Sequence, residues 1–132
     1  LAGLEAQTAA VPGVPPFVRG DATPWQATET PSWPTDAIRA DRLHDAGATA
    51  IQELAWALAE GVDRLAAAVA SGTPVATAAG DCAFVFAVGS TYFVEIAKLR
   101  AARLLWATAV SAFAPEAEPV GPMRLHVRTA RA

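Results

Sequence analysis

The sequence predicts an α/β domain made of a few strand and helix units, preceded by an extended arm. Residues 84–106, FVFAVGSTYFVEIAKLRAARLLW, join a short apolar strand to a long helix with almost no polar side. Six prolines fall within residues 1–36, where they prevent a helix or a central strand. We therefore predict an extended proline-rich arm over residues 1–36 and a helix-strand-helix-strand domain over residues 37–132.

The arm carries large apolar side chains but has no core of its own. Phe17, Trp25 and Trp33 are its bulkiest groups. Such a segment wraps either its own domain or a neighbouring chain, and the sequence leaves both possibilities open.

The first helix of the domain is predicted by apolar residues at steps of three and four. These residues are Ile51, Leu54, Leu58, Val62, Leu65 and Val69. The opposite, solvent-facing side is expected to carry Glu53, Trp56, Glu60 and Asp63. A tryptophan exposed among carboxylates indicates a contact with another subunit or with the arm. Gly72 followed by Pro74 is expected to end this helix.

A strand over residues 82–88 follows, and its continuous apolar run is typical of a strand covered on both faces. The helix over residues 91–113 has no charged residue after Arg103, so we expect it to bury more than one flank. A proline-rich turn precedes a last strand over residues 123–128. If the two strands are parallel, they form a βαβ unit with the helix between them.

Composition and net charge limit the classes of function that this chain can have. The net charge of −3 argues against a nucleic-acid surface, and the 53% of hydrophobic residues fits a chain that buries surface in a partner. A single cysteine, Cys82, forms no internal disulfide. No membrane span and no secretory signal is recognised, so we expect a cytoplasmic protein. Because the sequence begins at Leu1, we also expect a trimmed chain or a fragment.

Four segments resemble the methylmalonyl-CoA mutase family, which rearranges CoA thioesters with adenosylcobalamin. The pattern F-x-F-x-x-G-x-x-x-F-x-E-I-A-K-L-R-A-A-R-x-L-W at residues 84–106 resembles a segment of the family's acyl-CoA-binding barrel. Residues 44–58 resemble the preceding βα unit, residues 123–129 the following strand, and residues 12–20 the lead-in. A barrel needs about 250 residues, and this chain has 132. The resemblance thus implies a partial, cut-down fold of TIM-barrel-like βα units.

The resemblance also implies that the family's site residues are missing. Active members carry R-x-S at the start of the F-x-F strand, in contact with CoA, whereas residues 81–83 here are DCA. An anion there would repel phosphates. Active members carry H-x-Q-T-S in the strand after the helix, whereas residues 126–130 are HVRTA. Residues 41–47, DRLHDAG, miss the cobalamin motif D-x-H-x-x-G by one residue, so His44 is expected to cap or pack. The family's catalytic Tyr and His are expected to lie in segments that this chain lacks.

The remaining polar residues give weak candidates for a site. Glu95 and Lys98 have the spacing of an ordinary helical ion pair. Arg124, His126 and Arg128 alternate along the last strand and therefore share one of its faces. These three candidate catalytic residues could bind a carboxylate or a phosphate at the carboxyl end of a barrel-like strand. A solvated strand face is the alternative interpretation.

Three hypotheses follow. The first is a non-catalytic protein, similar to the small subunit of heterodimeric bacterial mutases, that pairs with a catalytic large subunit. Such a protein binds no cofactor itself, and adenosylcobalamin is implied only for the partner. Its interface residues would be Trp25, Trp33, Trp56 and Trp106. The second is a repurposed small enzyme or ligand-binding homo-oligomer, with a pocket for a small acyl or anionic ligand near His126. The third is a decayed fragment. We favour the first, because each departure from the family pattern removes catalysis while the packing pattern survives.

Overall fold

The structure is a computed structural model. It describes residues 36–113 and 120–130. All but the last residue of the predicted arm, including Trp25 and Trp33, lies outside the described residues.

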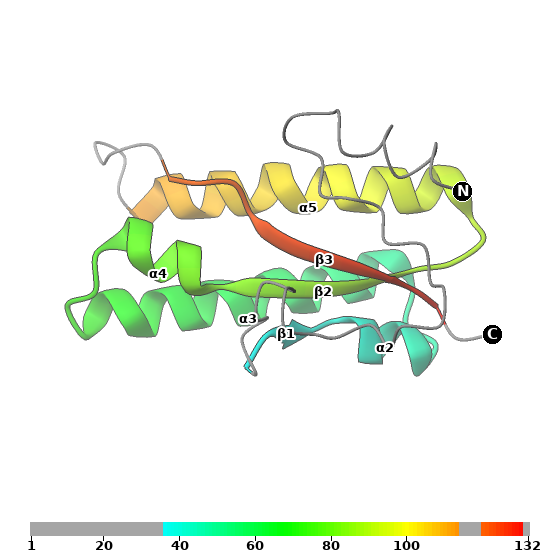
Figure 1. The fold of residues 1–132 in the computed structure, drawn as a ribbon, viewed down its shortest axis with the longest axis horizontal. Helices are drawn as coiled ribbons and strands as arrows, with labels where there is room; N and C mark the ends of the chain where they lie inside the picture. Colours follow the sequence, from blue (N-terminus) through cyan, green and yellow to red (C-terminus); the bar gives the residue numbers. More distant parts are fainter. Residues whose placement is uncertain (1–35, 114–119, 131–132) are drawn as a thin grey trace, which may run out of the picture. The chain divides into compact units, whose positions relative to one another are not determined.

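Three strands form a parallel sheet in the order β1-β2-β3 (Figure 1). They are β1 (Ile38–Arg39), β2 (Ala83–Val88) and β3 (Arg124–Thr129). β2 pairs with β3 over its whole length, whereas β1 pairs only with Phe84 and Val85. The α/β class and the parallel βαβ unit predicted from the sequence are confirmed.

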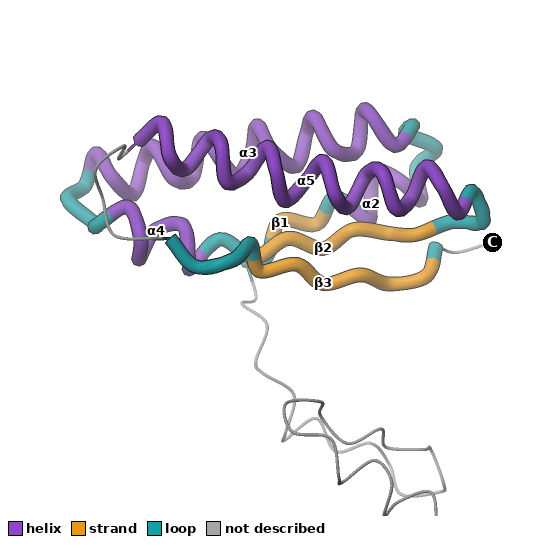
Figure 2. The backbone as a smooth tube through the Cα atoms, turned by 90° about the horizontal axis from the view of Figure 1, so that it is seen from above, coloured by secondary structure: helices purple, strands orange, loops and turns teal. Residues whose placement is uncertain are grey.

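The described helices are α2 (Asp41–Asp45), α3 (Ala50–Ala70), α4 (Val75–Asp81) and α5 (Tyr92–Phe113). The two long helices, α3 and α5, lie in one layer and the strands in another (Figure 2). Consecutive parallel strands with both long helices on one side occur in a barrel and also in each half of a doubly wound sheet. The predicted barrel-like units therefore agree with the structure.

Helix α3 begins at a capping box and ends at the glycine that the sequence predicts. Thr49 and Gln52 form a capping box: the Gln52 N–H donates to Thr49 Oγ1 and the Thr49 N–H donates to Gln52 Oε1. At the other end Gly72 adopts a φ of +96°, which a residue with a Cβ rarely reaches. The Thr73 N–H reaches back 3.0 Å to the Ala68 carbonyl, which completes a Schellman motif.

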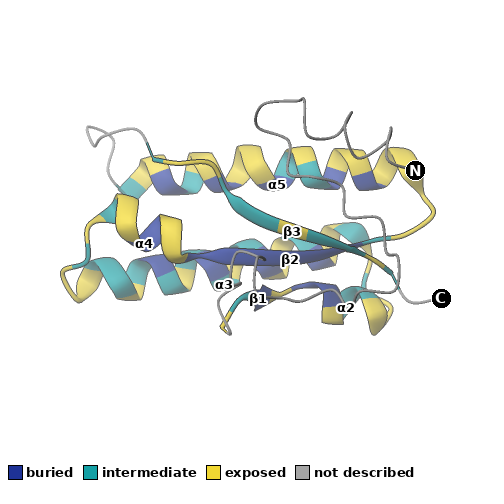
Figure 3. Ribbon diagram, viewed as in Figure 1, coloured by how far each residue is buried: buried dark blue, intermediate teal, exposed yellow. Residues whose placement is uncertain are grey.

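The core lies between β2 and the two long helices, and β2 is buried along most of its length (Figure 3). Phe84 packs edge-on against Trp106, with ring centroids 4.9 Å apart. Trp106 is only 2% exposed. The prediction that Trp106 lies at an interface is therefore wrong, because this side chain fills the chain's own core.

The buried side of α3 is rotated relative to the predicted apolar stripe. Its buried residues are Glu53, Ala57, Gly61 and Leu65. Ile51, expected in the core, is 79% exposed, and Glu53, expected in solvent, is 0% exposed. A charged group inside the core is possible here because it is fully paired, as described below.

Helix α5 buries a single stripe within the described part of the chain. The stripe consists of Glu95, Lys98, Ala102, Trp106 and Val110. The other flanks expose large apolar side chains, including Tyr92, Phe93, Leu104 and Leu105. The expected second buried flank is thus not supplied by residues 36–113 and 120–130.

Three short elements were not predicted by periodicity: β1, α2 and α4. Each is too short to show a hydrophobic repeat, with two, five and seven residues respectively. Over the residues described, neither long helix has an apolar run sufficient to cross a bilayer.

Candidate functional site

Charged side chains gather where the carboxyl ends of the strands meet α2, α3 and α5. They form two groups, defined here by their residues. The Glu53 cluster consists of His44, Glu53, Glu95 and Lys98. The Asp41 cluster consists of Arg39, Asp41, Asp45 and Arg128. Both clusters draw on the short helix α2, which supplies His44 to one and Asp41 and Asp45 to the other.

The Glu53 cluster is centred on a buried pair between two helices. Lys98 of α5 donates to Glu53 Oε2 of α3 at 2.7 Å and to the Ala87 carbonyl of β2 at 2.6 Å. The Ala87 N–H donates to Glu53 Oε1 at 3.1 Å. A buried charge is tolerated when it is both paired and hydrogen-bonded, and these contacts meet that condition for both ions.

The position of this pair follows from the short first strand. In a parallel sheet the N–H and C=O of one residue point to the same neighbouring strand, and alternate residues point to opposite sides. The Val88 carbonyl accepts from Ala130 on the β3 side, so the backbone of Ala87 faces the β1 side. There β1 has already ended at Arg39, and Glu53 and Lys98 take the place of the missing strand residue.

Glu95 satisfies the next backbone N–H that faces the same side, which is that of Gly89. Its Oε1 accepts from the Gly89 N–H at 3.1 Å. Its Oε2 lies 2.6 Å from Lys98 Nζ and forms an ion pair with it across one turn of α5. Burial opposes ionisation, yet the contacts with Lys98 and Gly89 prevail and lower the pKa of Glu95 below its usual value.

His44 closes the Glu53 cluster from α2. Its Nδ1 lies 3.2 Å from Glu53 Oε2, an oxygen that Lys98 also contacts. The ring is therefore held by a buried carboxylate. His44 is thus packed against the cluster, as expected from the sequence.

In the Asp41 cluster two arginines hold one buried carboxylate. Arg39 donates to Asp41 at 2.8 and 2.7 Å, and Arg128 of β3 donates to the same carboxylate at 2.6 Å. Arg128 also contacts the carboxylate of Asp45. The hydrogen bonds from Arg39, followed by those from Arg128, lower the pKa of Asp41 to about 2 although burial opposes this.

The structure spreads the three candidate catalytic residues along β3. Arg124 is the first residue of the strand and donates to the Gly80 carbonyl at 3.2 Å. Arg128 is held by Asp41 and Asp45 near the other end, about 13 Å along the strand. His126 is exposed between them. The register places Arg39, Val85 and His126 side by side, so the predicted shared face exists. Its cations are not gathered at one point.

Two of the predicted interface tryptophans lie outside the described residues, Trp106 is in the core, and Trp56 is 40% exposed on α3. Sequence reasoning missed Glu53 as a buried partner, because periodicity placed it opposite the apolar stripe. The available signal was Lys98: a cation on the buried side of a helix requires an anion from another element.

The chemistry open to the two clusters is limited by these pairings. Among described residues there is no group of three His, Cys, Asp or Glu side chains suited to a metal ion. The resemblance implies adenosylcobalamin for the family, and we assign no reaction step to that cofactor in the two clusters.

Comparison with known proteins identifies relatives along most of the chain. The family model described as "Methylmalonyl-CoA mutase" matches residues 17–132. The methylmalonyl-CoA mutase of Rhizobium meliloti (strain 1021) is 41% identical over 109 residues, covering 83% of this chain and 15% of that protein. The methylmalonyl-CoA mutase large subunit of Propionibacterium freudenreichii subsp. shermanii is 37% identical over 105 residues, covering 80% of this chain and 14% of that protein.

The relatives are therefore much longer than this sequence, which spans about 15% of the Rhizobium protein. The similarity includes the elements that carry both charge clusters, since the family model covers every described element of the fold. This chain belongs to the methylmalonyl-CoA mutase family.

Proposed function

We propose that this chain is a non-catalytic member of its family that pairs with a catalytic mutase large subunit. The observation that carries the proposal is that Lys98 and Arg128 are already paired with carboxylates of this chain. Lys98 is bound by Glu53 and Glu95, and Arg128 by Asp41 and Asp45. Cations that are paired with the chain's own carboxylates stabilise the edge of the sheet. They are not available to bind a substrate phosphate or carboxylate.

The edge strand β3 supports a protein partner. In the part of the chain that the structure describes, β3 pairs only with β2. Because the Ala130 N–H points to β2, alternate backbone groups, including the Thr129 N–H, face the open edge. Such a row of donors and acceptors is a template for another strand.

The cofactor and the acyl-CoA substrate belong to the large subunit in this proposal. The clusters of this chain would position its sheet edge against the partner. Adenosylcobalamin would then bind the complex with the same stoichiometry as it binds the large subunit alone.

The test is light scattering after size exclusion, on the full chain mixed with a mutase large subunit from the same organism. We expect a defined one-to-one complex. Separate elution of the two chains under all mixing ratios would reject the proposed pairing.

A pair of variants at the sheet edge locates the contact. Thr129→Pro removes an outward N–H without touching the β2 ladder, and we expect it to weaken the complex. Thr129→Val keeps the N–H and the strand propensity, so it should bind as the unmodified chain does. Equal binding by both variants would place the large subunit elsewhere on the molecule.

A further inference from the structure

The two long helices expose surfaces with the same spacing of an aromatic residue and a charge. We call Phe93, Arg100 and Leu104 the outer α5 surface, and Trp56, Asp63 and Ala67 the outer α3 surface. In each set the second residue follows the aromatic one by seven positions and the third by eleven. Residues at such steps lie on one face of a helix.

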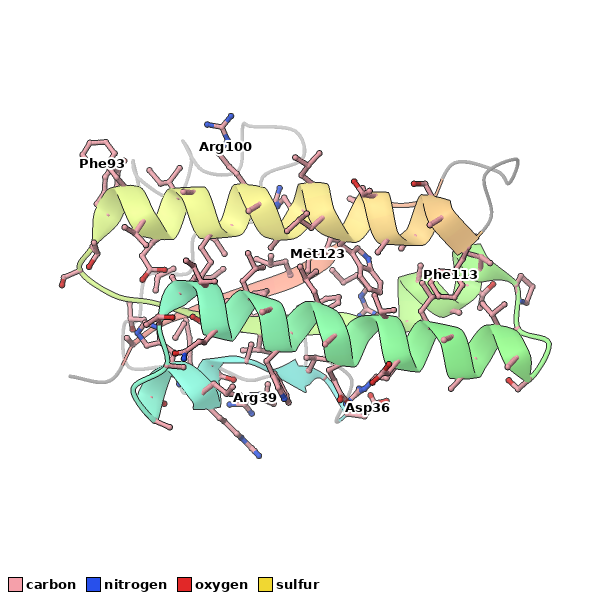
Figure 4. All side chains as sticks on the ribbon, turned by 180° about the vertical axis from the view of Figure 1, so that it is seen from behind. Asp36, Arg39, Phe93, Arg100, Phe113 and Met123 are labelled. Atoms are coloured by element: carbon pink, nitrogen blue, oxygen red, sulfur yellow. The ribbon has the colours of Figure 1, made fainter. Side chains whose placement is uncertain are left out.

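The outer α5 surface is apolar with a cation at its centre. Phe93 is 82% exposed, and Arg100 and Leu104 are also exposed. Phe93 and Arg100 project from the side of α5 turned away from α3 (Figure 4). No described residue forms an ion pair with Arg100. The surface thus offers an apolar contact and an unmatched positive charge.

The outer α3 surface has the opposite charge. Trp56 is 40% exposed, and Asp63 and Ala67 are exposed on the same helix. Asp63 has no ion-pair partner among the described residues. Its neighbour Glu60 is already bound by Arg64 at 2.8 Å. The unmatched carboxylate therefore complements the unmatched guanidinium of the other helix.

Charge placement argues against a symmetric contact of α5 with itself. Arg100 lies near the middle of Tyr92–Phe113. Two copies of α5 packed antiparallel about a two-fold axis would bring the two arginines together. Like charges opposed in a contact weaken it, so the partner surface must be acidic at its centre.

The direction of the helices allows the outer α3 surface to be that partner. Both long helices return between parallel strands, so they run in the same direction. On each surface the charged residue lies about 10 Å along the helix axis from the aromatic residue, at 1.5 Å per residue. The two surfaces therefore match when the helices are aligned in parallel. We propose that the outer α5 surface of one molecule docks on the outer α3 surface of a second copy, with Phe93 against Trp56 and Arg100 against Asp63.

This contact is head-to-tail, since one molecule keeps its outer α3 surface unused and the other keeps its outer α5 surface unused. Such association adds further copies or closes into a ring. Part of it depends on an exposed ion pair, so added salt should weaken it. The inference goes beyond the proposed pairing with a large subunit and does not depend on it, because it is tested with this chain alone.

The experiment is sedimentation velocity on the full chain over a range of concentrations at low salt. We expect reversible oligomers for the natural sequence. Arg100→Asp places a carboxylate against Asp63 of the neighbouring copy, and Asp63→Arg places a guanidinium against Arg100. Each variant alone should therefore weaken association about tenfold. Both side chains are exposed, and circular dichroism should show unchanged folding.

Recombining the two variants is the decisive step. An equimolar mixture of Arg100→Asp and Asp63→Arg pairs opposite charges at every mixed contact, and it should restore association. The double variant Arg100→Asp/Asp63→Arg should also restore it within a single chain.

Two charge reversals at other exposed sites serve as controls. Arg42→Asp in α2 and Asp81→Arg in α4 make matched changes away from both outer surfaces, and they should leave association unchanged. A monomeric natural chain at all concentrations would overturn the proposal. It would also be overturned if the mixture failed to associate after both single variants had lost association.

Discussion

Lys98 shows how one residue joins three elements of this fold. Its ammonium group contacts Glu53 of α3, Glu95 of its own helix and the Ala87 carbonyl of β2. Removing one member of a buried pair leaves the other charge without compensation, and that costs more than the pair itself contributes. The residue is therefore a sensitive point for stability.

We expect Lys98→Met to lower the free energy of unfolding by about 3 to 5 kcal/mol, because Glu53 would remain buried and charged. Glu53→Gln should also destabilise, but its amide oxygen can still accept the Ala87 N–H. The double variant should cost about 1 to 3 kcal/mol less than the sum of the two. Urea denaturation followed by circular dichroism measures all three.

Glu60→Gln provides the matched control within α3. It breaks the half-exposed pair with Arg64 and should change stability by less than about 1 kcal/mol. If Lys98→Met cost no more than this control, the Glu53 cluster would not be stabilising.

Asp41 makes stability depend on acid pH. Its pKa falls from 3.8 to about 2 on folding. Each unit corresponds to about 1.4 kcal/mol, so the carboxylate contributes about 2 kcal/mol above pH 4, which is lost as the pH falls toward 2. Asp41→Asn should be less stable at neutral pH, and its unfolding curve should approach that of the natural chain near about pH 2.

The measurement is the midpoint of urea unfolding as a function of pH for both chains. Asp81→Asn, at an exposed position, is the control and should retain the pH dependence of the natural sequence. A constant difference between Asp41→Asn and the natural chain across the acid range would contradict the assignment.

At the scale of elements, Gly61 of α3 packs directly against the ring of Phe84 in β2. A Cβ built there would lie 2.7 Å from the Phe84 ring and 2.9 Å from the Trp106 ring. Phe84 is fully buried, so its ring has little room to move. The absence of a side chain at this position sets the distance between the helix and the sheet.

Gly61→Ala should therefore destabilise the domain by about 1 to 3 kcal/mol, although alanine favours the helix by about 1 kcal/mol. Gly80→Ala in α4 is the matched control, since no atom lies within 4 Å of a Cβ at that position. Thermal unfolding should show a lower midpoint for the first variant and an equal or higher one for the second. If Gly61→Ala stabilised the chain instead, α3 would be able to move away from β2 without an energetic cost.

Element prediction succeeded where a pattern repeats and failed where an element is short. Helix α3 and its stop at Gly72 follow from apolar spacing and glycine chemistry. The two residues of β1 carry no period at all. Their existence depends on pairing with β2, which the local sequence does not encode.

At the scale of the whole molecule, the reactivity of the Cys82 thiol measures unfolding. The thiol is buried, and burial raises its pKa above the ordinary value. Alkylation by iodoacetamide at mildly alkaline pH should be slow in the folded chain and should accelerate with urea in parallel with unfolding. Equal rates in the native and fully unfolded chain would show that this part of the core is open.

The sequence by itself determined the family, the α/β class, the two long helices and the βαβ unit that joins β2 to β3. It did so because these depend on local periodicity and on a long stretch of matching residues. Only the tertiary structure decided that Glu53 is buried, that Trp106 fills the core, and that Arg128 is held by α2. Those outcomes depend on groups far apart in the chain, such as Glu53 and Lys98, which meet because β1 ends early and leaves the Ala87 backbone to be satisfied.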